Sequence, residues 1–487
     1  MTDQLLISPN SKTFDWGKLL ICLSFAAVLP LFVIFDPDNV LLSLFVLVCF
    51  GCIALLSRLY SLFKLRYLTL PGCFLIYYFI RFFPSSIIIY LQEAGDARYA
   101  FIVSHCIFIL SFTIGVIIAL GIVSNYKRFE TKIYYLKSFV TESSSSLKTY
   151  YCVIFLFAFG IFALYLFYQR NLPFFYAMSN PGEVLKIAQL RDESHKLLDI
   201  GWLKYSYGWA KHVLFPFLMV FTFVNYQSSK RKTWLSLFIF SLMLSITVSV
   251  LNFEKGPIVK VFALLFLIQF LMSYKKWGVK KVITVSAIGF VIMFAVPAIM
   301  IIYWAGLPFN LGSLWIAELG ILKRLFWKGV SLQYNYFTLF PIDGHTFLHG
   351  AGIRPLAQLL NLEHFPVVRY AYHELVGGKL QSGNASTGFF VLGYVDFGYF
   401  GVFIMSTLMG IFLGVLHVCF VRAKKNTTNF SIYMFFMILS MGLFSHAITV
   451  WLLTSGVVVM FLLRFLKPIC DSLNKTLRLS IEKRESP

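Results

Sequence analysis

The sequence has few charged residues. Only 13% of its 487 residues are Asp, Glu, Lys or Arg, whereas 59% are hydrophobic and 18% are aromatic. About a quarter of the residues in soluble domains are charged, so this composition excludes an ordinary soluble protein. The mean hydropathy is correspondingly high, at +0.78. The sequence therefore predicts an all-α polytopic membrane protein, with residues 1–487 forming one integral membrane domain.

Apolar runs of about 20 residues, long enough to cross a bilayer, recur along the chain. Twelve of them are predicted to be transmembrane helices, at residues 18–35, 40–57, 73–92, 99–123, 149–168, 210–226, 234–252, 258–273, 282–303, 388–420, 430–447 and 448–466. The N-terminal stretch leads directly into the first of these runs, so we expect no cleaved signal peptide.

Acidic residues are even scarcer than basic ones: 21 against 42, which gives a formal net charge of +21. The basic residues gather in alternate connections between the predicted spans, at 58–72, 124–148, 228–233, 274–281 and 422–426, and in the tail 467–487. Because basic loops remain in the cytoplasm, both termini are predicted to be cytoplasmic. Topology then accounts for the positive charge, and we expect no nucleic-acid partner.

Two long connections do not follow this pattern, residues 169–209 and 304–387, and both are predicted to lie on the outer side of the membrane. Neither contains a cysteine, so no disulfide is expected in them. Apolar residues at helical spacing, with three interleaved cations, predict an amphipathic helix at the outer membrane interface over 313–340. A second helical stretch is expected over 356–378, broken at Pro366.

The sequence also lacks Walker A, GxGxxG and HExxH motifs, so no nucleotide or metal cofactor is expected. The spacing of Asp343, His345 and His349 matches no standard metal site. Cys49 and Cys52 form a CxxC pair inside a predicted span, where packing is the expected role.

Cations on the predicted outer face are the first candidates for chemistry. Arginine forks match the oxygens of phosphates, and lysine supplies a point charge, so several converging cations could hold a pyrophosphate. The four candidates are Arg191, Lys255, Arg324 and Arg354. The alternative for each is an ordinary interfacial side chain with its charge in water.

Acid–base candidates follow in the second long loop. His373 and Glu374, in "YAYHELVGG", could each take a proton from a sugar hydroxyl, with His373 as the first choice.

Two polar residues in predicted spans are candidates for a supporting role at the site. Arg81 lies in a span that Pro84 should break, and Asp396 lies where the second loop re-enters the membrane. Asp396 is expected to tie down a loop cation.

Four features together resemble the Wzy family of O-antigen and oligosaccharide repeat-unit polymerases, including enterobacterial common-antigen polymerase. They are the two large loops, the segment "NFEKGPIVKVFALLFL", the order of Arg324, "GAGIRP" and "RYAYHELVGG", and the segment "STGFFVLGYVDFGYFG". The residue-level similarity covers about 250–265 and 318–416. Arginine-to-glycine spacings in the first loop depart from those of some family members.

The resemblance implies a membrane-embedded glycosyltransferase of the bacterial inner membrane. It would join repeat units carried on undecaprenyl pyrophosphate, at the periplasmic face, by moving the growing chain onto the incoming unit. The implied partners are the lipid-linked oligosaccharide and membrane lipid, and a chain-length regulator protein is left open. The alternatives are an O-antigen ligase and a flippase for lipid-linked oligosaccharides. A flippase should have short external loops, which this chain does not have.

Overall fold

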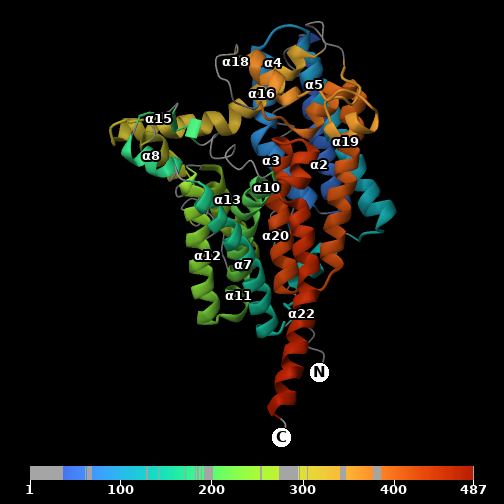
Figure 1. The fold of residues 1–487 in the computed structure, drawn as a ribbon. Coiled ribbons are helices and arrows are strands. Elements are labelled where there is room, and N and C mark those ends of the chain that lie inside the picture. Colours follow the sequence, from blue (N-terminus) through green and yellow to red (C-terminus); the bar gives the residue numbers. More distant parts are fainter. Residues whose placement is uncertain are drawn as a thin grey trace.

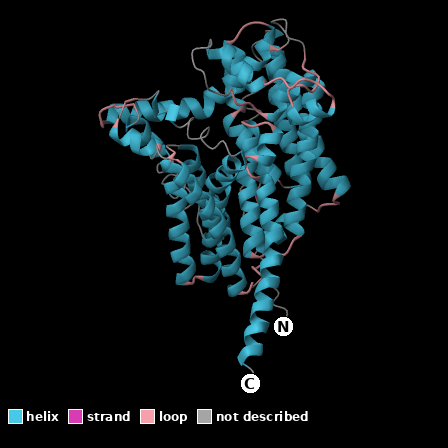
Figure 2. Ribbon diagram, viewed as in Figure 1, coloured by secondary structure: helices cyan, strands magenta, loops and turns pink. Residues whose placement is uncertain are grey.

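Helices joined by loops make up the part of the chain that the structure, a computed structural model, describes, and this part contains no strand (Figures 1 and 2). The described residues are 37–60, 62, 68–127, 130–140, 142–169, 172–180, 182–183, 186–187, 189–190, 201–252, 255–273, 284, 294–295, 297–303, 305–340, 347–376 and 385–485. The prediction of an all-α polytopic membrane protein is confirmed.

The first half of the chain contains the helices α2 (Pro37–Tyr60), α3 (Leu70–Arg81), α4 (Phe83–Gln92), α5 (Asp96–Ile117) with the π-helix η2 (Ile118–Val123), α6 (Glu130–Leu136), α7 (Ser144–Tyr168), α8 (Pro173–Ser179), α10 (Gly201–Trp209) with η3 (Ala210–Leu214), α11 (Phe215–Ser229), α12 (Lys232–Leu251) and α13 (Lys255–Ser273). The second half contains α15 (Leu311–Leu322) with η5 (Lys323–Lys328), α16 (Gly329–Leu339), α17 (Arg354–Leu359), α18 (Val367–Val376), α19 (Phe389–Arg422), α20 (Thr427–Met441) with η6 (Gly442–Phe444), α21 (Ile448–Leu453) and α22 (Val457–Glu485).

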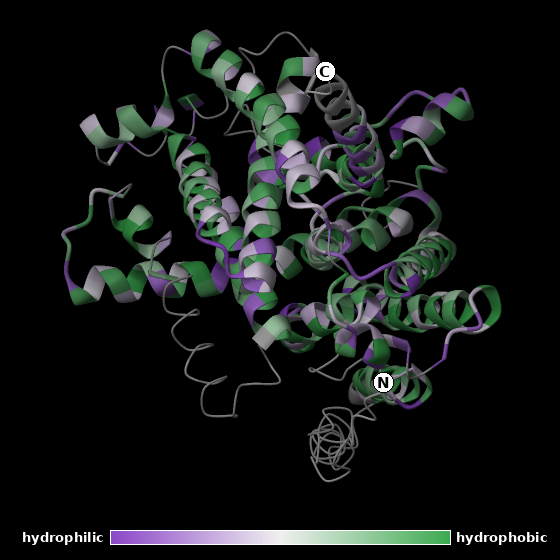
Figure 3. Cartoon of the chain, turned by 90° about the horizontal axis from the view of Figure 1, so that it is seen from below, coloured by the Kyte–Doolittle hydropathy of each residue, from purple (hydrophilic) through white to green (hydrophobic). Residues whose placement is uncertain are grey.

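Nine helical segments of the described chain are long and apolar enough to cross a membrane, and a shorter one covers Gly256–Met272. These ten coincide with ten of the twelve predicted spans. The predicted span 18–35 lies outside the described residues, and most of 282–303 does too. Most residues of the bundle helices are hydrophobic (Figure 3), and many large apolar side chains are exposed on their outer faces, as lipid contact requires.

The two ends of the bundle differ. One end, at the top of Figure 1, carries α16, α17 and α18, and we call it the cap end. The opposite end, where α22 leaves the bundle, is the tail end. The break expected at Pro366 is present, because α17 ends at Leu359 and α18 begins at Val367.

The most extensive packing between two described helices is that of α5 with α19. A Cβ atom on Gly410 would clash with the carbonyl oxygen of Phe112, and one on Gly414 would clash with Ala119. A Cβ atom on Gly115 of α5 would likewise clash with the carbonyl oxygen of Thr407 in α19. Small residues let the two backbones touch, which is how helices associate in lipid. The Gly410–Gly414 pair therefore serves packing inside the chain.

Helix α19 is sharply kinked near its cap end. The backbone leaves helical geometry at Phe397 and Gly398, where Gly398 has φ +62. Past the kink the chain folds back closely, and a Cβ on Gly393 would lie 2.8 Å from the carbonyl oxygen of Gly401. Only glycine adopts this φ at no steric cost. The glycines at the start of this span thus make the bend possible.

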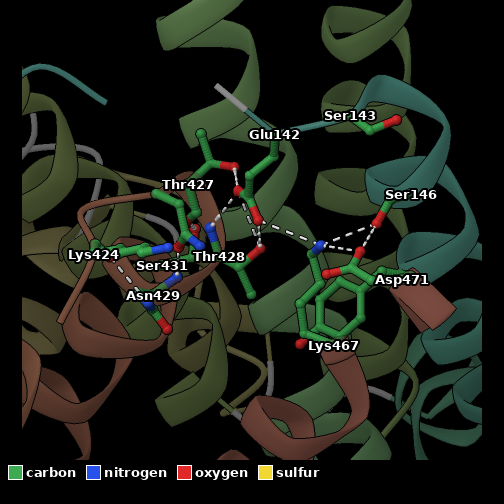
Figure 4. A network of polar contacts seen from close by, with 12 residues as sticks. Glu142, Ser143, Ser146, Lys424, Thr427, Thr428, Asn429, Ser431, Lys467 and Asp471 are labelled. Carbon is green, nitrogen blue, oxygen red and sulfur yellow. Dashed lines mark hydrogen bonds and ion pairs between the residues drawn. The ribbon is translucent and has the colours of Figure 1, made fainter. Parts of the chain in front are cut away.

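A polar network joins three segments at the tail end (Figure 4). Glu142 accepts hydrogen bonds from Thr427 Oγ1 (2.7 Å) and Thr428 Oγ1 (3.2 Å), at the start of α20. Lys467 of α22 lies 3.4 Å from Glu142 and 2.6 Å from Asp471. Both Glu142 and Lys467 have side chains only 10% exposed, so the network anchors α22 where it leaves the bundle.

Candidate functional site

A cavity of about 830 Å³ opens at the cap end between α10, α17, α18 and α21. Its lining contains two arginines, one histidine and several aromatic residues, and no Asp or Glu among the described residues. The lining residues are Trp202, Tyr205, Ser206, Trp209, Gly352, Arg354, Pro355, Gln358, His364, Pro366, Val367, Val368, Arg369, Leu392, Ala447, Thr449, Val450, Leu453 and Thr454. A cavity with this charge is suited to an anionic ligand.

The loop that precedes Arg354, residues 347–353, is docked on the kink of α19. The kink leaves carbonyl groups free, and those of Val395 and Asp396 accept hydrogen bonds from the backbone N–H groups of Leu348 (3.1 Å) and His349 (2.8 Å). The ring of Phe347 fills the space beside Gly398. The kink therefore fixes the position of this loop.

The carboxylate of Asp396 completes the docking. Its Oδ1 accepts hydrogen bonds from the backbone N–H groups of Gly350, at 3.2 Å, and Gly352, at 2.9 Å. Asp396 is fully buried. Gly350 has φ +98, a conformation that favours glycine. Asp396 thus holds the loop two residues before Arg354. The expectation that it ties down a cation is corrected, because the carboxylate binds backbone amides.

Two arginines reach the cavity from neighbouring short helices. Arg354 is the first residue of α17 and follows the docked loop directly, whereas Arg369 lies in the first turn of α18. Both side chains are exposed. Since an arginine stays charged at any physiological pH, the cavity carries two permanent positive charges.

The one histidine of the cavity lining is His364. Its Nδ1 lies 2.9 Å from the carbonyl oxygen of Ala351, in the docked loop. A carbonyl oxygen can only accept, so Nδ1 carries the hydrogen and Nε2 keeps its lone pair in the neutral ring. His364 is therefore held in the tautomer in which Nε2 can take a proton.

The opposite wall of the cavity is apolar and belongs to helices of the membrane bundle. Trp202, Tyr205 and Trp209 come from α10, and Val450 and Leu453 come from α21. The indole Nε1 of Trp209 donates a hydrogen bond to the carbonyl oxygen of Leu453, at 2.7 Å, which joins the two helices. Trp202, Tyr205 and Leu453 are also exposed on the surface. The cavity thus has a largely apolar side that is open to the surface of the protein.

Of the four predicted pyrophosphate ligands, the structure places Arg354 in this cavity. Arg324 lies on η5, and its exposed side chain is not part of the lining. Arg191 and the side chain of Lys255 lie outside the described residues. Their predicted roles remain predictions.

The predicted bases do not line the cavity. His373 lies one helical turn beyond Arg369 on α18, and its neighbour Glu374 is exposed. Among the described residues there is no group of three metal-ligating side chains, and Asp343 and His345 lie outside them. The cavity lining contains His364 in place of the two predicted bases.

Arg81 supports the cap and does not line the cavity. The expected break is present, with α3 ending at Arg81 and α4 starting at Phe83. The guanidinium hydrogen-bonds Tyr77 Oη, lies 5.0 Å from the ring of Phe82, and touches Gly329 at the start of α16. Beside it, Ser85 donates to the carbonyl oxygen of Phe326, at 2.5 Å. Arg81 thus helps to fasten η5 and α16 to the bundle.

Sequence reasoning missed His364 and Arg369 as site residues, together with the aromatic face of α10. The signal for the first two was local: they flank Pro366, the residue that separates α17 from α18 and turns the chain back toward Arg354. The contribution of α10 could not be inferred locally, because more than 140 residues separate Trp209 from Arg354.

Comparisons with known proteins found no matching family model, curated protein or solved structure.

Proposed function

We propose that this protein is a membrane-embedded glycosyltransferase that polymerises oligosaccharide repeat units carried on undecaprenyl pyrophosphate. Its topology would have twelve spans with both termini in the cytoplasm, and the cap end would face the periplasm of the bacterial inner membrane. The growing chain on one lipid would be the donor, and the incoming lipid-linked unit would be the acceptor.

One observation carries this proposal. Arg354, Arg369 and His364 share a cavity of about 830 Å³ with three aromatic residues of α10, Trp202, Tyr205 and Trp209. Paired arginines suit a pyrophosphate, because each guanidinium can bind two phosphate oxygens at once. The aromatic residues of α10 offer flat apolar surfaces to sugar rings, and the apolar side between α10 and α21 suits a prenyl chain.

The proposed reaction needs one base and stabilisation of one leaving group. The acceptor hydroxyl oxygen attacks the anomeric carbon of the donor sugar, and its proton passes to Nε2 of His364. The bond between the anomeric carbon and the phosphate oxygen breaks, and undecaprenyl pyrophosphate leaves with the bonding electrons. Arg354 and Arg369 would stabilise the negative charge that develops on it. The pyrophosphate itself activates the sugar.

The test is to incubate purified protein with a lipid-pyrophosphate repeat unit alone and to separate the products by size. A ladder of glycans supports the proposal. Transfer only to an added lipid A core would identify a ligase, and movement of the lipid across vesicles without new glycosidic bonds would identify a flippase. Either of these results would overturn the polymerase proposal.

A further inference from the structure

Beyond the cavity, the structure contains a second surface with a clear chemical character. Helix α8, residues 297–303 and helix α15 pack together beside the bundle, and we call this unit the side arm. Ala298, Ile302 and Ala317 form its small core, and Tyr303 Oη donates to the carbonyl oxygen of Met178, at 3.1 Å. In Figure 1 the side arm projects to the left, with α15 lying across the direction of α12.

The surface of the side arm is unusually apolar. Leu311 is 87% exposed, and Trp315 and Ile316 are each 62% exposed. Further large exposed apolar residues of the arm and the loop before α15 are Phe175, Met178, Ile299, Phe309 and Leu319. Soluble surfaces rarely expose so many large apolar residues together. This surface is therefore covered in the functional protein.

The position of the side arm indicates what covers it. Helix α8 follows shortly after α7 ends at Tyr168, and it contacts α12, which places it at the cap-side boundary of the membrane. The last residues of α7 are also exposed and apolar, with Phe167 at 79%. The apolar surface of the arm thus continues the lipid-facing surface of the bundle. With 12 residues, α15 is too short to span a bilayer, which needs about 20.

Three cations follow the apolar part of the arm. Helix α15 continues as η5, which carries Lys323, Arg324 and Lys328, all exposed. Cations next to an apolar surface at the membrane boundary attract anionic phospholipid headgroups. We propose that the side arm lies in the cap-side leaflet of the membrane, with its apolar residues among the acyl chains and these three cations on anionic phospholipid headgroups. Arg324 would then contact lipid and not the substrate.

The test uses the full chain in lipid nanodiscs and follows the fluorescence of Trp315. The chain has nine tryptophans, so the signal is the difference between the unchanged protein and Trp315→Phe. We expect this difference emission to be blue-shifted and quenched by phospholipid brominated near the headgroup. Trp451, which is fully buried, gives the matched control: the difference for Trp451→Phe should be quenched much less. A red-shifted, unquenched Trp315 signal would overturn the proposal.

The headgroup preference has its own readout. Brominated phosphatidylglycerol should quench the Trp315 signal more than the same fraction of brominated phosphatidylcholine. The combined variant Lys323→Gln, Arg324→Gln, Lys328→Gln should lose this preference but keep the blue shift and its unfolding temperature in detergent. Equal quenching by the two lipids in the unchanged protein would refute the role of the cations. A blue-shifted Trp315 signal in native membranes, together with no quenching by brominated lipid in nanodiscs, would mean that a protein partner covers the surface. That result would overturn the proposal.

Discussion

Oδ1 of Asp396 accepts a hydrogen bond from the backbone N–H of Gly352 at 2.9 Å, which joins a kinked membrane helix to the loop that carries Arg354. The same oxygen also accepts from Gly350. A buried carboxylate that binds backbone amides fixes the loop without using a cation of the site. Both arginines of the cavity thereby stay available to a ligand.

These hydrogen bonds predict that Asp396 contributes by positioning the docked loop and not by its charge. Asp396→Ala removes both acceptor contacts and should abolish polymerisation, whereas Asp396→Asn keeps a carbonyl oxygen as acceptor and should retain much of it. The measurement is the glycan ladder formed from a lipid-linked unit, at equal amounts of protein in the membrane. A role for the charge itself would instead make the Asn variant as inactive as the Ala variant.

Substitution of Gly352, whose backbone N–H donates to Asp396, tests the docking of the loop independently. A Cβ there would lie 2.9 and 3.0 Å from the two oxygens of Asp396 and 2.8 Å from Val367 Cγ2. Gly352→Ala should therefore displace the loop and reduce the ladder. Gly160→Ala is the matched control, because nothing lies within 4 Å of its added Cβ. Equal activity of the two variants would show that the docked loop does not matter for the reaction.

Substitution of Arg354 or Arg369 should reduce turnover far more than substitution of Arg324, which lies outside the cavity. Loss of one group that stabilises developing negative charge typically costs about 100-fold or more in turnover. We expect losses of this order for Arg354→Ala and Arg369→Ala, and an intermediate loss for Arg354→Lys, which keeps the charge but not the fork. Arg324→Ala serves as control and should leave the ladder nearly unchanged in detergent. The opposite ranking would return Arg324 to the site.

His364 should be required for proton transfer, whereas His349 should not. His364→Ala removes Nε2 from the cavity and is expected to reduce turnover by about 100-fold, within the usual range for a general base. His349 lies in the docked loop before α17, is exposed and has φ 50, a conformation that Asn tolerates well. His349→Asn should therefore keep the activity. If His373→Ala is inactive and His364→Ala is active, the original choice of base was right.

The sequence was most informative where the membrane determines the structure. Apolar length located ten of the spans, and Pro366 predicted the break between α17 and α18, because both follow from local chemistry. The cavity was harder to predict. Arg354 could be chosen from its neighbours, but the partnership of His364, Arg369 and Trp209 depends on how α10, α18 and α21 meet. Such contacts depend on tertiary packing, which no local pattern records.

Helix packing between α5 and α19 gives a prediction about stability and oligomerisation. Gly410→Leu would force the side chain against the backbone of α5 near Phe112, so we expect less folded protein and a lower unfolding temperature. Gly51→Leu is a suitable control, because no atom lies within 4 Å of its added Cβ. If Gly410 instead formed a dimer interface, the variant would fold normally and change its size on a detergent column.

Glu142 and Lys467 of the tail-end network are both nearly buried. Breaking this ion pair should therefore lower the stability of the protein. Lys467→Met leaves the carboxylates of Glu142 and Asp471 without their cation, and breaking such a pair typically costs about 3 kcal/mol. Glu142→Gln keeps an acceptor for Thr427 and Thr428 and should cost less. When the two changes are combined, the loss should be smaller than the sum of the single losses, since neither partner then leaves the other uncompensated. Unfolding in detergent, followed by helical circular dichroism, measures all three variants. Additive losses would show that Lys467 anchors α22 through Asp471 and Ser146 alone.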